Sequence, residues 1–447
     1  MSQKTVSSTI LVIFGISGDL SHRYLLPALS AVRKAGQLPV DFQMLGISRR
    51  DITMSAVFGT PELLNSELEA HTELRKMNLD DPSDYKKLAK TLKDSGAEQI
   101  IFYFAVPPEG VQPIIAQMGK AGLNGPNIKL LLEKPFGVDL ASAKNVIKDV
   151  AKYFNDQQVY RIDHYLAKEM AQNISVFLGG NTLFRDVWNS KFIESIEVIV
   201  AERINIEGRF RFYEQTGALR DVIQSHALQL AALTIMEPCT SVFEFEELPA
   251  RRLAALSSMR LGPGGVQESA IRGQYEGYRE EVENPKSNTE TFVALTLFSG
   301  SPRWKNVPIR IVTGKNLDAK LSEIRIRFKK SHASQANLLV IRIQPDEGIT
   351  LDLWVKEPGY ERKLKKLKLG FTYEQHFDHL PDAYEQVLVD AFRANQHLFA
   401  SGKEVLAAWT ILQPVLDQWT KDGSRGLRFY KPGTSFANVL RSKSPKG

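Results

Sequence analysis

The sequence predicts an α/β fold in its first third and an α+β fold in the remainder. Up to about residue 163, runs of β-branched and aromatic residues alternate with helical patterns, which is typical of a doubly wound parallel sheet. Further on, consecutive strand-like runs with turn-like links predict a larger domain with a mainly antiparallel sheet and helices on one face. We therefore expect domains at 1–163 and 164–432, followed by a flexible tail at 433–447.

The composition is that of a globular protein and excludes several classes. The 447 residues are 43% hydrophobic and 24% charged, with a net charge of +6, which suits anionic small molecules as well as nucleic acid. The one dense basic run, 362–368, lacks interleaved aromatics, so we interpret it as a solvated edge strand rather than a nucleic-acid site. Cys239 is the only cysteine, which excludes internal disulfides and cysteine-cluster metal sites and favours a reducing compartment.

No targeting or membrane signal is visible in the sequence. The segment 1–9 lacks the charged-then-apolar order of a signal peptide, and the apolar run 10–14 is far shorter than a membrane span. We therefore expect a cytoplasmic protein that binds neither membrane nor nucleic acid.

The first strand, Thr9–Phe14, runs into Gly15-Ile16-Ser17-Gly18-Asp19-Leu20, after which a helical pattern begins. Glycines let the backbone approach a pyrophosphate, and the N-terminus of a helix supplies free N–H groups and partial positive charge. Ser21 replaces the third glycine of the common fingerprint, and such turns recur in many proteins, so the motif alone is weak. Together with its flanking strand and helix, it predicts a Rossmann-like dinucleotide site.

The second strand, 42–47, ends in Ser48-Arg49-Arg50. An acidic residue at this point would accept a hydrogen bond from the adenosine ribose, whereas arginines favour a 2′-phosphate. The alternative is a pair of solvated arginines at a strand end. No acid appears before Asp51, so the sequence predicts NADP rather than NAD.

The rest of the first domain alternates strand and helix. The last of its strands closes on Glu133-Lys134-Pro135-Phe136-Gly137, at the strand end where open α/β sheets bind ligands. Whether Pro135 is cis is left open. We expect helices at 54–74, 85–92, 111–118 and 140–153, and strands at 99–106 and 129–132.

The densest group of ionisable side chains lies at Arg161–Glu169. Such groups are costly to bury without partners or a task. If a helix starts near Tyr165, Lys168 lies on the same face as His164, four residues earlier, and the pair forms a positive pocket suited to phosphate. Asp163 could hold a second imidazole from elsewhere in the chain. The alternative is a helix start with Asp163 as N-cap and solvated charges behind it.

In the second domain, the strand 193–201 ends at Glu202, and a long helix, 216–236, carries Asp221, Ser225 and His226. A lone histidine on an apolar helix is more often a satisfied core residue than a base. The remaining strands are expected at 291–298, 308–313, 323–328, 338–343 and 349–354, with helices 382–399 and 404–419 packed onto their sheet.

Seven motifs make the chain similar to the glucose-6-phosphate dehydrogenase family over nearly its whole length, and the nine residues from Arg161 are the most specific of them. The resemblance implies NADP-dependent oxidation of D-glucose 6-phosphate at C1 to 6-phospho-D-glucono-1,5-lactone, in the oxidative pentose phosphate pathway. It also implies a homodimer or homotetramer and no metal. The motifs are Gly15–Leu20, Glu133–Gly137, Arg161–Glu169, Leu219–His226, Thr313–Lys315, Ile341–Pro345 and Leu380–Glu385.

The resemblance also implies roles for individual residues. His226 resembles the general base that removes the C1 hydroxyl proton, and Asp163 resembles the carboxylate that orients it. Substrate contacts are implied for His164, Tyr165 and Lys168 at the phosphate, and for Lys134, Glu202, Asp221, Lys315, Lys320 and Gln344. Cofactor contacts are implied for Gly15, Ser17, Gly18, Asp19, Leu20, Ser48, Arg49, Arg50, Ala105, Pro107 and Lys134.

Three departures from the family pattern bear on this interpretation. Tyr24 replaces a lysine that borders the active site. Leu321 stands where members with a second, structural NADP carry a lysine, although Arg342 is compatible with that site. The segment 433–436 lacks the usual tryptophan. Two alternatives stay open: an oxidoreductase acting on unphosphorylated sugars, and a catalytically silent regulator that binds NADP or a sugar phosphate.

Overall fold

The computed structural model describes residues 8–60, 63, 67–239, 245–330 and 335–442. The chain forms two compact units. Unit 1 contains the described residues up to Gly137, then Ala141–Ala167 and Pro381–Val405, and unit 2 contains the rest. The expected boundary after residue 163 therefore lies four residues before that of the structure, and the later segment 381–405 returns to unit 1.

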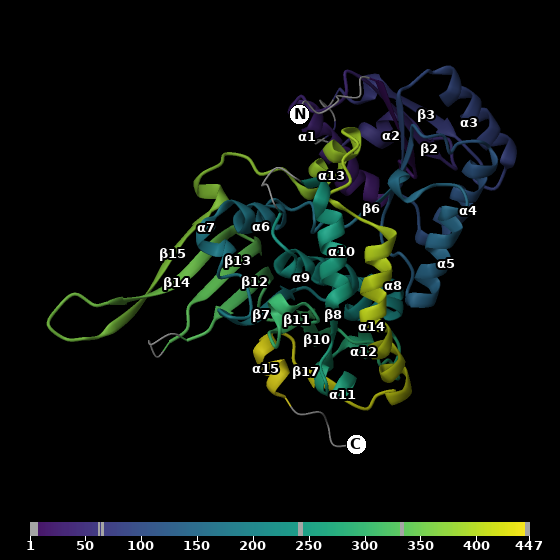
Figure 1. Cartoon of the computed structure of the whole chain (residues 1–447). Coiled ribbons are helices and arrows are strands. Elements are labelled where there is room, and N and C mark those ends of the chain that lie inside the picture. Colours follow the sequence, from purple (N-terminus) through teal and green to yellow (C-terminus); the bar gives the residue numbers. More distant parts are fainter. Residues whose placement is uncertain (1–7, 61–62, 64–66, 240–244, 331–334, 443–447) are drawn as a thin grey trace. The chain divides into compact units, whose positions relative to one another are not determined.

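Unit 1 is built on a seven-stranded sheet in the order β16-β6-β5-β4-β1-β2-β3. Figure 1 labels its strands β2, β3 and β6. All its neighbouring strands are parallel except β16, which runs antiparallel to β6. The central strands β1 and β4 are buried except for Ser8 at the start of β1, as expected where helices cover both faces of a sheet. The strands are β1 (Ser8–Phe14), β2 (Asp41–Ser48), β3 (Thr72–Lys76), β4 (Gln99–Phe104), β5 (Ile128–Leu132), β6 (Val159–Ile162) and β16 (Phe399–Ala400).

Two expectations about helices in this unit are wrong. The helix expected at 54–74 ends at Phe58, and 72–76 instead forms β3, because pairing with β2 overrides the helix propensity of its Glu, Leu, Arg and Lys residues. The helix expected to pack on the antiparallel sheet, α13, lies against α1 instead. The helices are α1 (Leu26–Lys34) with the π-helix Ser21–Leu25 before it, α2 (Met54–Phe58), α3 (Pro82–Asp94), α4 (Pro108–Lys120), α5 (Leu140–Ala151) and α13 (Ala383–Phe392).

Unit 2 is built on a ten-stranded, mainly antiparallel sheet in the order β15-β14-β13-β12-β7-β11-β10-β9-β17, with β8 paired to β10. Its parallel pairs are β7–β11 and β9–β17. The basic run forms part of β15, an exposed edge strand as predicted (Figure 1). The strands are β7 (Ile193–Ala201), β8 (Met259–Leu261), β9 (Ala270–Tyr275), β10 (Phe292–Ser299), β11 (Pro308–Gly314), β12 (Leu321–Phe328), β13 (Leu338–Gln344), β14 (Gly348–Lys356), β15 (Leu364–Thr372) and β17 (Leu427–Tyr430).

The helix expected at 216–236 is interrupted near its start, because Gly217 adopts φ 63° and ψ 176°, and the region is divided among three elements. They are α8 (Phe210–Ala218), the π-helix η4 (Leu219–Ala227) and α9 (Leu228–Ile235). The other helices of unit 2 are α6 (Glu169–Gly180), α7 (Thr182–Arg185), α10 (Leu248–Ser258), α11 (Gly265–Ser269), α12 (Tyr278–Glu281), α15 (Phe436–Arg441) and α14 (Gly402–Asp422), whose residues up to Val405 belong to unit 1.

The segment expected to be a flexible tail is largely folded. Helix α15 buries Val439, and the Arg428 guanidinium donates to the carbonyls of Val439 and Leu440. Residues 443–447 lie outside the described part of the chain. Among the described helices, none has the length and apolar character needed to cross a membrane.

Candidate functional site

In unit 1, the glycine turn after β1 approaches the end of β4 so closely that only glycine fits. Gly15 has φ +86°, and a Cβ built on it would lie 2.3 Å from the Ala105 carbonyl oxygen. The backbone N–H of Ala105 in turn donates to the Phe14 carbonyl at 2.9 Å. This contact explains why a glycine is needed at the first position of the motif.

Hydrogen bonds fix the shape of the turn. The N–H of Gly15 donates to the Ile47 carbonyl at 3.0 Å, and the N–H of Gly18 donates to the Gly15 carbonyl at 2.9 Å. Ser21 is buried, and its hydroxyl also donates to the Gly15 carbonyl at 3.0 Å. The residue that replaces the third glycine thus braces the turn from within, while Ser17 and Asp19 stay exposed.

The expected cofactor residues meet at one edge of the sheet. In the register of the parallel strands, Phe14 lies opposite both Ile47 of β2 and Phe104 of β4. The segments at the ends of these strands, Gly15–Leu20, Ser48–Arg50 and Ala105–Pro107, therefore leave the sheet side by side. The chain passes to β2 on one side of β1 and later to β4 on the other, which makes this edge the switch point where such sheets bind ligands.

The Glu133-Lys134-Pro135 turn follows β5 and is tied down through Glu133. The carboxylate of Glu133 accepts a hydrogen bond from the Tyr103 hydroxyl at 2.5 Å and another from Tyr384 of α13. Burial raises the pKa of Glu133, while both tyrosines and the charge of Lys134 oppose that rise and the charge of Asp163 adds to it. The Lys134–Pro135 bond is cis.

Asp163 starts a tight turn rather than a helix. Its Oδ1 accepts the Tyr165 N–H at 3.0 Å, and its backbone carbonyl accepts the Leu166 N–H at 3.0 Å. Helix α6 begins only at Glu169, with Lys168 as its N-cap residue. The expectation that His164 and Lys168 share a helical face is therefore wrong, because the four residues between Asp163 and Lys168 are not helical. His164 and Tyr165 belong to unit 1, and Lys168 belongs to unit 2.

In unit 2, two expected substrate residues form an ion pair at neighbouring strand ends. Strands β7 and β11 are parallel, with Ala201 opposite Gly314, so the next residues, Glu202 and Lys315, lie side by side. The Lys315 ammonium contacts the Glu202 carboxylate and lies 5.2 Å from the centre of the Tyr213 ring. Lys315 is buried and Glu202 partly exposed, so the pair reaches the surface through its carboxylate.

Two further expected residues lie at the adjoining strand ends. β12 is antiparallel to β7 with Leu321 opposite Ala201, which places the preceding residue, Lys320, beside Glu202. Gln344 ends β13, and its side-chain amide donates to the Ser322 hydroxyl at 3.2 Å. The ends of β13, β12, β7 and β11 thus gather an amide, a lysine, a carboxylate and a second lysine.

Helix η4 carries Asp221 and His226 and packs against β7 and β11. Tyr213 is close to both this helix and the strand ends. Burial raises the pKa of its phenol well above the usual value, and the charges of Asp221, Glu202 and Glu290 raise it further. His226 is 3% exposed. Unit 2 therefore brings Asp221, Glu202 and Lys315 together around Tyr213. The expected partner of His226, Asp163, belongs to unit 1, and their pairing stays a proposal.

Lys168 has an acidic neighbour that the sequence did not point to. Glu347 accepts the Met170 N–H at the start of α6 at 2.8 Å. Burial raises the pKa of Glu347, and the hydrogen bond from Met170 and the charge of Lys168 oppose that rise. Lys168 therefore lies close to the loop that begins at Gln344.

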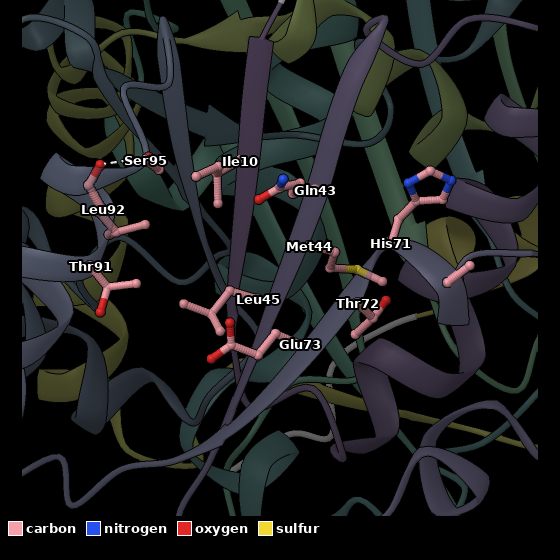
Figure 2. A pocket seen from close by; sticks show the side chains of 11 residues that line it. Ile10, Gln43, Met44, Leu45, His71, Thr72, Glu73, Thr91, Leu92 and Ser95 are labelled. Atoms are coloured by element: carbon pink, nitrogen blue, oxygen red, sulfur yellow. Dashed lines mark hydrogen bonds between the residues drawn. The ribbon is translucent and has the colours of Figure 1, made fainter.

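A separate cavity of about 300 Å³ lies in unit 1, lined by β1, β2, β3 and α3 (Figure 2). Its walls include Ile10, Gln43, His71, Glu73 and Leu92. None of these residues lies at the carboxyl ends of β1 and β2, where the cofactor is expected. None of the expected site residues lines it. Among the described residues, no group of three or more His, Cys, Asp or Glu side chains could hold a metal ion.

Comparison with known proteins identifies the family. The model of the glucose-6-phosphate dehydrogenase NAD binding domain matches residues 12–173, and that of the glucose-6-phosphate dehydrogenase C-terminal domain matches residues 176–441. The chain belongs to the glucose-6-phosphate dehydrogenase family. It is therefore an oxidoreductase with a dinucleotide-binding domain for a nicotinamide cofactor.

Curated members of the family match nearly end to end. The glucose-6-phosphate 1-dehydrogenase of Chlamydia muridarum is 36% identical over 462 residues, covering 92% of this chain and 90% of its own. That of Dickeya dadantii is 35% identical and covers 96% and 95%. A solved glucose-6-phosphate dehydrogenase in complex with its substrate glucose-6-phosphate matches with a TM-score of 0.90 at 27% identity, covering 100% of both chains. The Mycobacterium avium enzyme matches with 0.83 at 28%, covering 96% and 94%.

Four residues beside the candidate site were missed from the sequence. Tyr213 and Glu347 are buried or half-buried polar groups next to expected site residues, Glu290 accepts a hydrogen bond at the start of η4, and Tyr384 donates a hydrogen bond to Glu133. Tyr384 was visible only as part of a family motif. No local pattern marks the other three, because each touches the site through residues far away in the chain.

Proposed function

We propose that this chain oxidises D-glucose 6-phosphate at C1 to 6-phospho-D-glucono-1,5-lactone with NADP as hydride acceptor, the first step of the oxidative pentose phosphate pathway. The observation that carries the proposal is the set of polar side chains at four neighbouring strand ends of unit 2, Glu202, Lys315, Lys320 and Gln344. Hydroxyl-rich ligands require such a mixture of donors and acceptors. A solved relative of the same fold is described as a complex with glucose-6-phosphate.

In this proposal, two side chains of the protein carry out the proton transfer of the reaction. His226 takes the proton of the C1 hydroxyl, and Asp163 holds the imidazole in position and stabilises it once charged. As the proton leaves, the C1–H bond gives up its hydride, and the C1–O bond becomes the lactone carbonyl. The bound nicotinamide ring supplies the hydride acceptor.

The remaining expected residues hold the sugar phosphate. His164, Tyr165 and Lys168 bind the phosphate, through a cationic and hydrogen-bonding surface suited to an oxyanion. Lys134 lies near both the sugar and the cofactor. Glu202, Asp221, Lys315, Lys320 and Gln344 bind the sugar hydroxyls or close the pocket.

The choice of NADP rests on the end of β2. Arg49 and Arg50 are exposed there, and the nearest acid, Asp51, already forms an ion pair with Lys76 at 2.7 Å. Two exposed guanidinium groups at the strand end suit a 2′-phosphate. We propose that the turn residues Gly15–Leu20 and the segment Ala105–Pro107 bind the rest of the cofactor.

A second, structural NADP is not part of the proposal. Leu321 stands where members with that site carry a lysine. The compatible residue, Arg342, is engaged by the buried carboxylate of Glu323 at 2.7 Å, which also binds Arg325 at 2.6 Å. Both guanidinium groups thus have a partner within the sheet.

We propose that the chain acts in the cytoplasm as a homodimer or homotetramer in which β14 and β15 form a contact between copies. These strands pair Leu351 with Leu369 and Leu353 with Leu367, which places four leucines on one face. Leu369 is 64% exposed and Leu367 47%. A contiguous exposed apolar face at a sheet edge is typical of an interface. Replacing Leu369 with Lys should shift the protein to a smaller species in analytical ultracentrifugation.

One assay tests the catalytic proposal against its alternatives. Formation of the reduced cofactor, NADPH or NADH, is followed spectrophotometrically with NADP or NAD, and with glucose or glucose 6-phosphate. The proposal expects turnover that needs the phosphate and prefers NADP. Equal turnover of glucose would favour an oxidoreductase for unphosphorylated sugars. Binding of NADP or sugar phosphate without any turnover at high enzyme concentration would favour a silent regulator.

A further inference from the structure

Two consecutive residues outside the expected site, Glu290 and Thr291, lie just before β10 in the core of unit 2. Glu290 is 6% exposed and Thr291 is fully buried. A buried carboxylate is costly unless it is hydrogen-bonded. The hydrogen bonds of Glu290 and Thr291 therefore indicate which elements these two residues hold in place.

Glu290 holds the start of helix η4. Its Oε1 accepts the Leu219 N–H at 3.0 Å, and its backbone carbonyl accepts the Ala218 N–H at 2.9 Å. A Cβ on Gly217 would lie 2.4 Å from the same Oε1, so the carboxylate also occupies the space beside that glycine. Leu219 is the first residue of the helix that carries Asp221 and His226.

Thr291 holds Lys315. Its carbonyl accepts the Lys315 N–H at 2.9 Å, and its hydroxyl lies 2.8 Å from the Tyr430 hydroxyl. The Tyr430 hydroxyl donates to the Lys315 carbonyl at 2.7 Å. Both backbone polar groups of Lys315 are thus bonded to the Thr291–Tyr430 pair, which leaves its side chain to reach Glu202.

We propose that Glu290 and Thr291 are positioning residues that set the placement of helix η4 relative to the Lys315–Glu202 pair. Because the two residues are adjacent in the chain, a shift of one element cannot occur without straining the contacts of the other. Glu290 acts on the helix that carries the proposed base, and Thr291 acts on the sugar-binding pair. This inference rests on the proposed function, since it concerns how that reaction is aligned.

The proposed placement of helix η4 relative to the Lys315–Glu202 pair predicts two separate kinetic defects. Glu290→Leu removes the acceptor for Leu219 and should lower kcat by about 10- to 100-fold, because small misplacements of a reacting group are costly, with a smaller rise in KM. Glu290→Gln keeps an acceptor oxygen and should stay within about threefold of the unmodified protein. Tyr430→Phe releases the Lys315 carbonyl and should raise KM for glucose 6-phosphate by about 3- to 10-fold, with kcat changed less.

A matched control separates positioning from general loosening. The Tyr278 hydroxyl lies in the same core cluster and donates to Glu214 at 2.8 Å rather than to Glu290 or Thr291. Tyr278→Phe should lower the melting temperature and leave kcat and KM unchanged. If Glu290→Leu does not fold, Glu290→Asp withdraws the acceptor by one methylene and should show the same fall in kcat.

The outcomes are distinct. The proposed split between kcat and KM, with recovery in Glu290→Gln, supports the inference. Equal activity of Glu290→Leu and Glu290→Gln, a proportional loss of both constants in every variant, or a kinetic defect in Tyr278→Phe would overturn it while the unmodified protein stays active. Absence of turnover in the unmodified protein would instead overturn the proposed function, and this inference with it.

Discussion

The ring of Tyr24 stacks on the ring of Tyr384, with centroids 5.4 Å apart and planes inclined by 21°. Tyr384 in turn bonds Glu133, the neighbour of Lys134. Tyr24 is therefore linked through an aromatic contact to the Glu133–Lys134 turn. The contact itself contributes about 0.5–1.5 kcal/mol beyond the buried area.

A lysine at position 24 should separate the effect of charge from that of packing. We expect Tyr24→Lys to lower KM for glucose 6-phosphate by about 2- to 5-fold, the range of a partly exposed charge interaction, and to reduce stability through loss of the stacked pair. Tyr24→Phe keeps the ring and should change neither quantity. Steady-state kinetics and thermal unfolding measure both effects. A higher KM in Tyr24→Lys would show that the extra charge does not act on the substrate.

The buried hydroxyl of Tyr213 leads to a prediction about the free energy of unfolding. Its hydroxyl is buried and has no hydrogen-bond partner among the described residues. Tyr213→Phe should therefore leave the free energy of unfolding unchanged or raise it by up to about 1–3 kcal/mol, because an unsatisfied polar group is removed. Tyr278→Phe, which loses the bond to Glu214, should lower it by about 0.5–1.5 kcal/mol. Urea denaturation would measure both, and a comparable loss in the two variants would contradict this account.

Gly217 should tolerate alanine far less well than another glycine with positive φ. Gly217 has φ +63° and a crowded Cβ position, whereas Gly277 has φ +94° and no atom within 4 Å of the position that a Cβ would take. Gly277→Ala should cost only the left-handed backbone strain, about 1–2 kcal/mol. Gly217→Ala should cost more and also reduce kcat, since it pushes on Glu290. Thermal unfolding and steady-state kinetics would measure both effects. Equal losses of stability and of kcat in the two variants would mean that the contact with Glu290 contributes to neither.

Arg49 should discriminate between the two cofactors. We expect Arg49→Ala to raise KM for NADP by about 10-fold or more and to leave KM for NAD nearly unchanged, because only NADP carries the 2′-phosphate that a guanidinium binds. Lys76→Ala serves as a control that frees Asp51 without removing Arg49, and it should improve the use of NAD slightly. Equal effects of Arg49→Ala on both cofactors would refute the role at the 2′-phosphate.

Local patterns in the sequence were sufficient for most of the fold and for the glycine turn. The strand Thr9–Phe14, the turn Gly15–Leu20 and the strand 193–201 follow from residues next to one another, and each was predicted nearly to its bounds. β3 and α13 were misjudged because their partners, β2 and α1, decide their structure and location.

In the site too, some features follow from the local sequence and others depend on partners far away in the chain. The Lys315–Glu202 pair joins residues 113 positions apart, and only the parallel register of β7 and β11 brings them together. Glu290 and Tyr430 could not be found at all, since a buried acid and a buried tyrosine carry no signal until their partners are known. Family motifs named the expected residues of the site, but not the residues that hold them.

In the proposed reaction, His226 accepts the proton while glucose 6-phosphate loses its hydride. The most direct test is kcat/KM of His226→Ala, measured by NADPH formation with saturating NADP and varied glucose 6-phosphate. We expect a loss of about 10²- to 10⁴-fold with the protein still folded, which is typical for removal of one general base. Turnover close to that of the unmodified protein would contradict the assignment of His226 as the base.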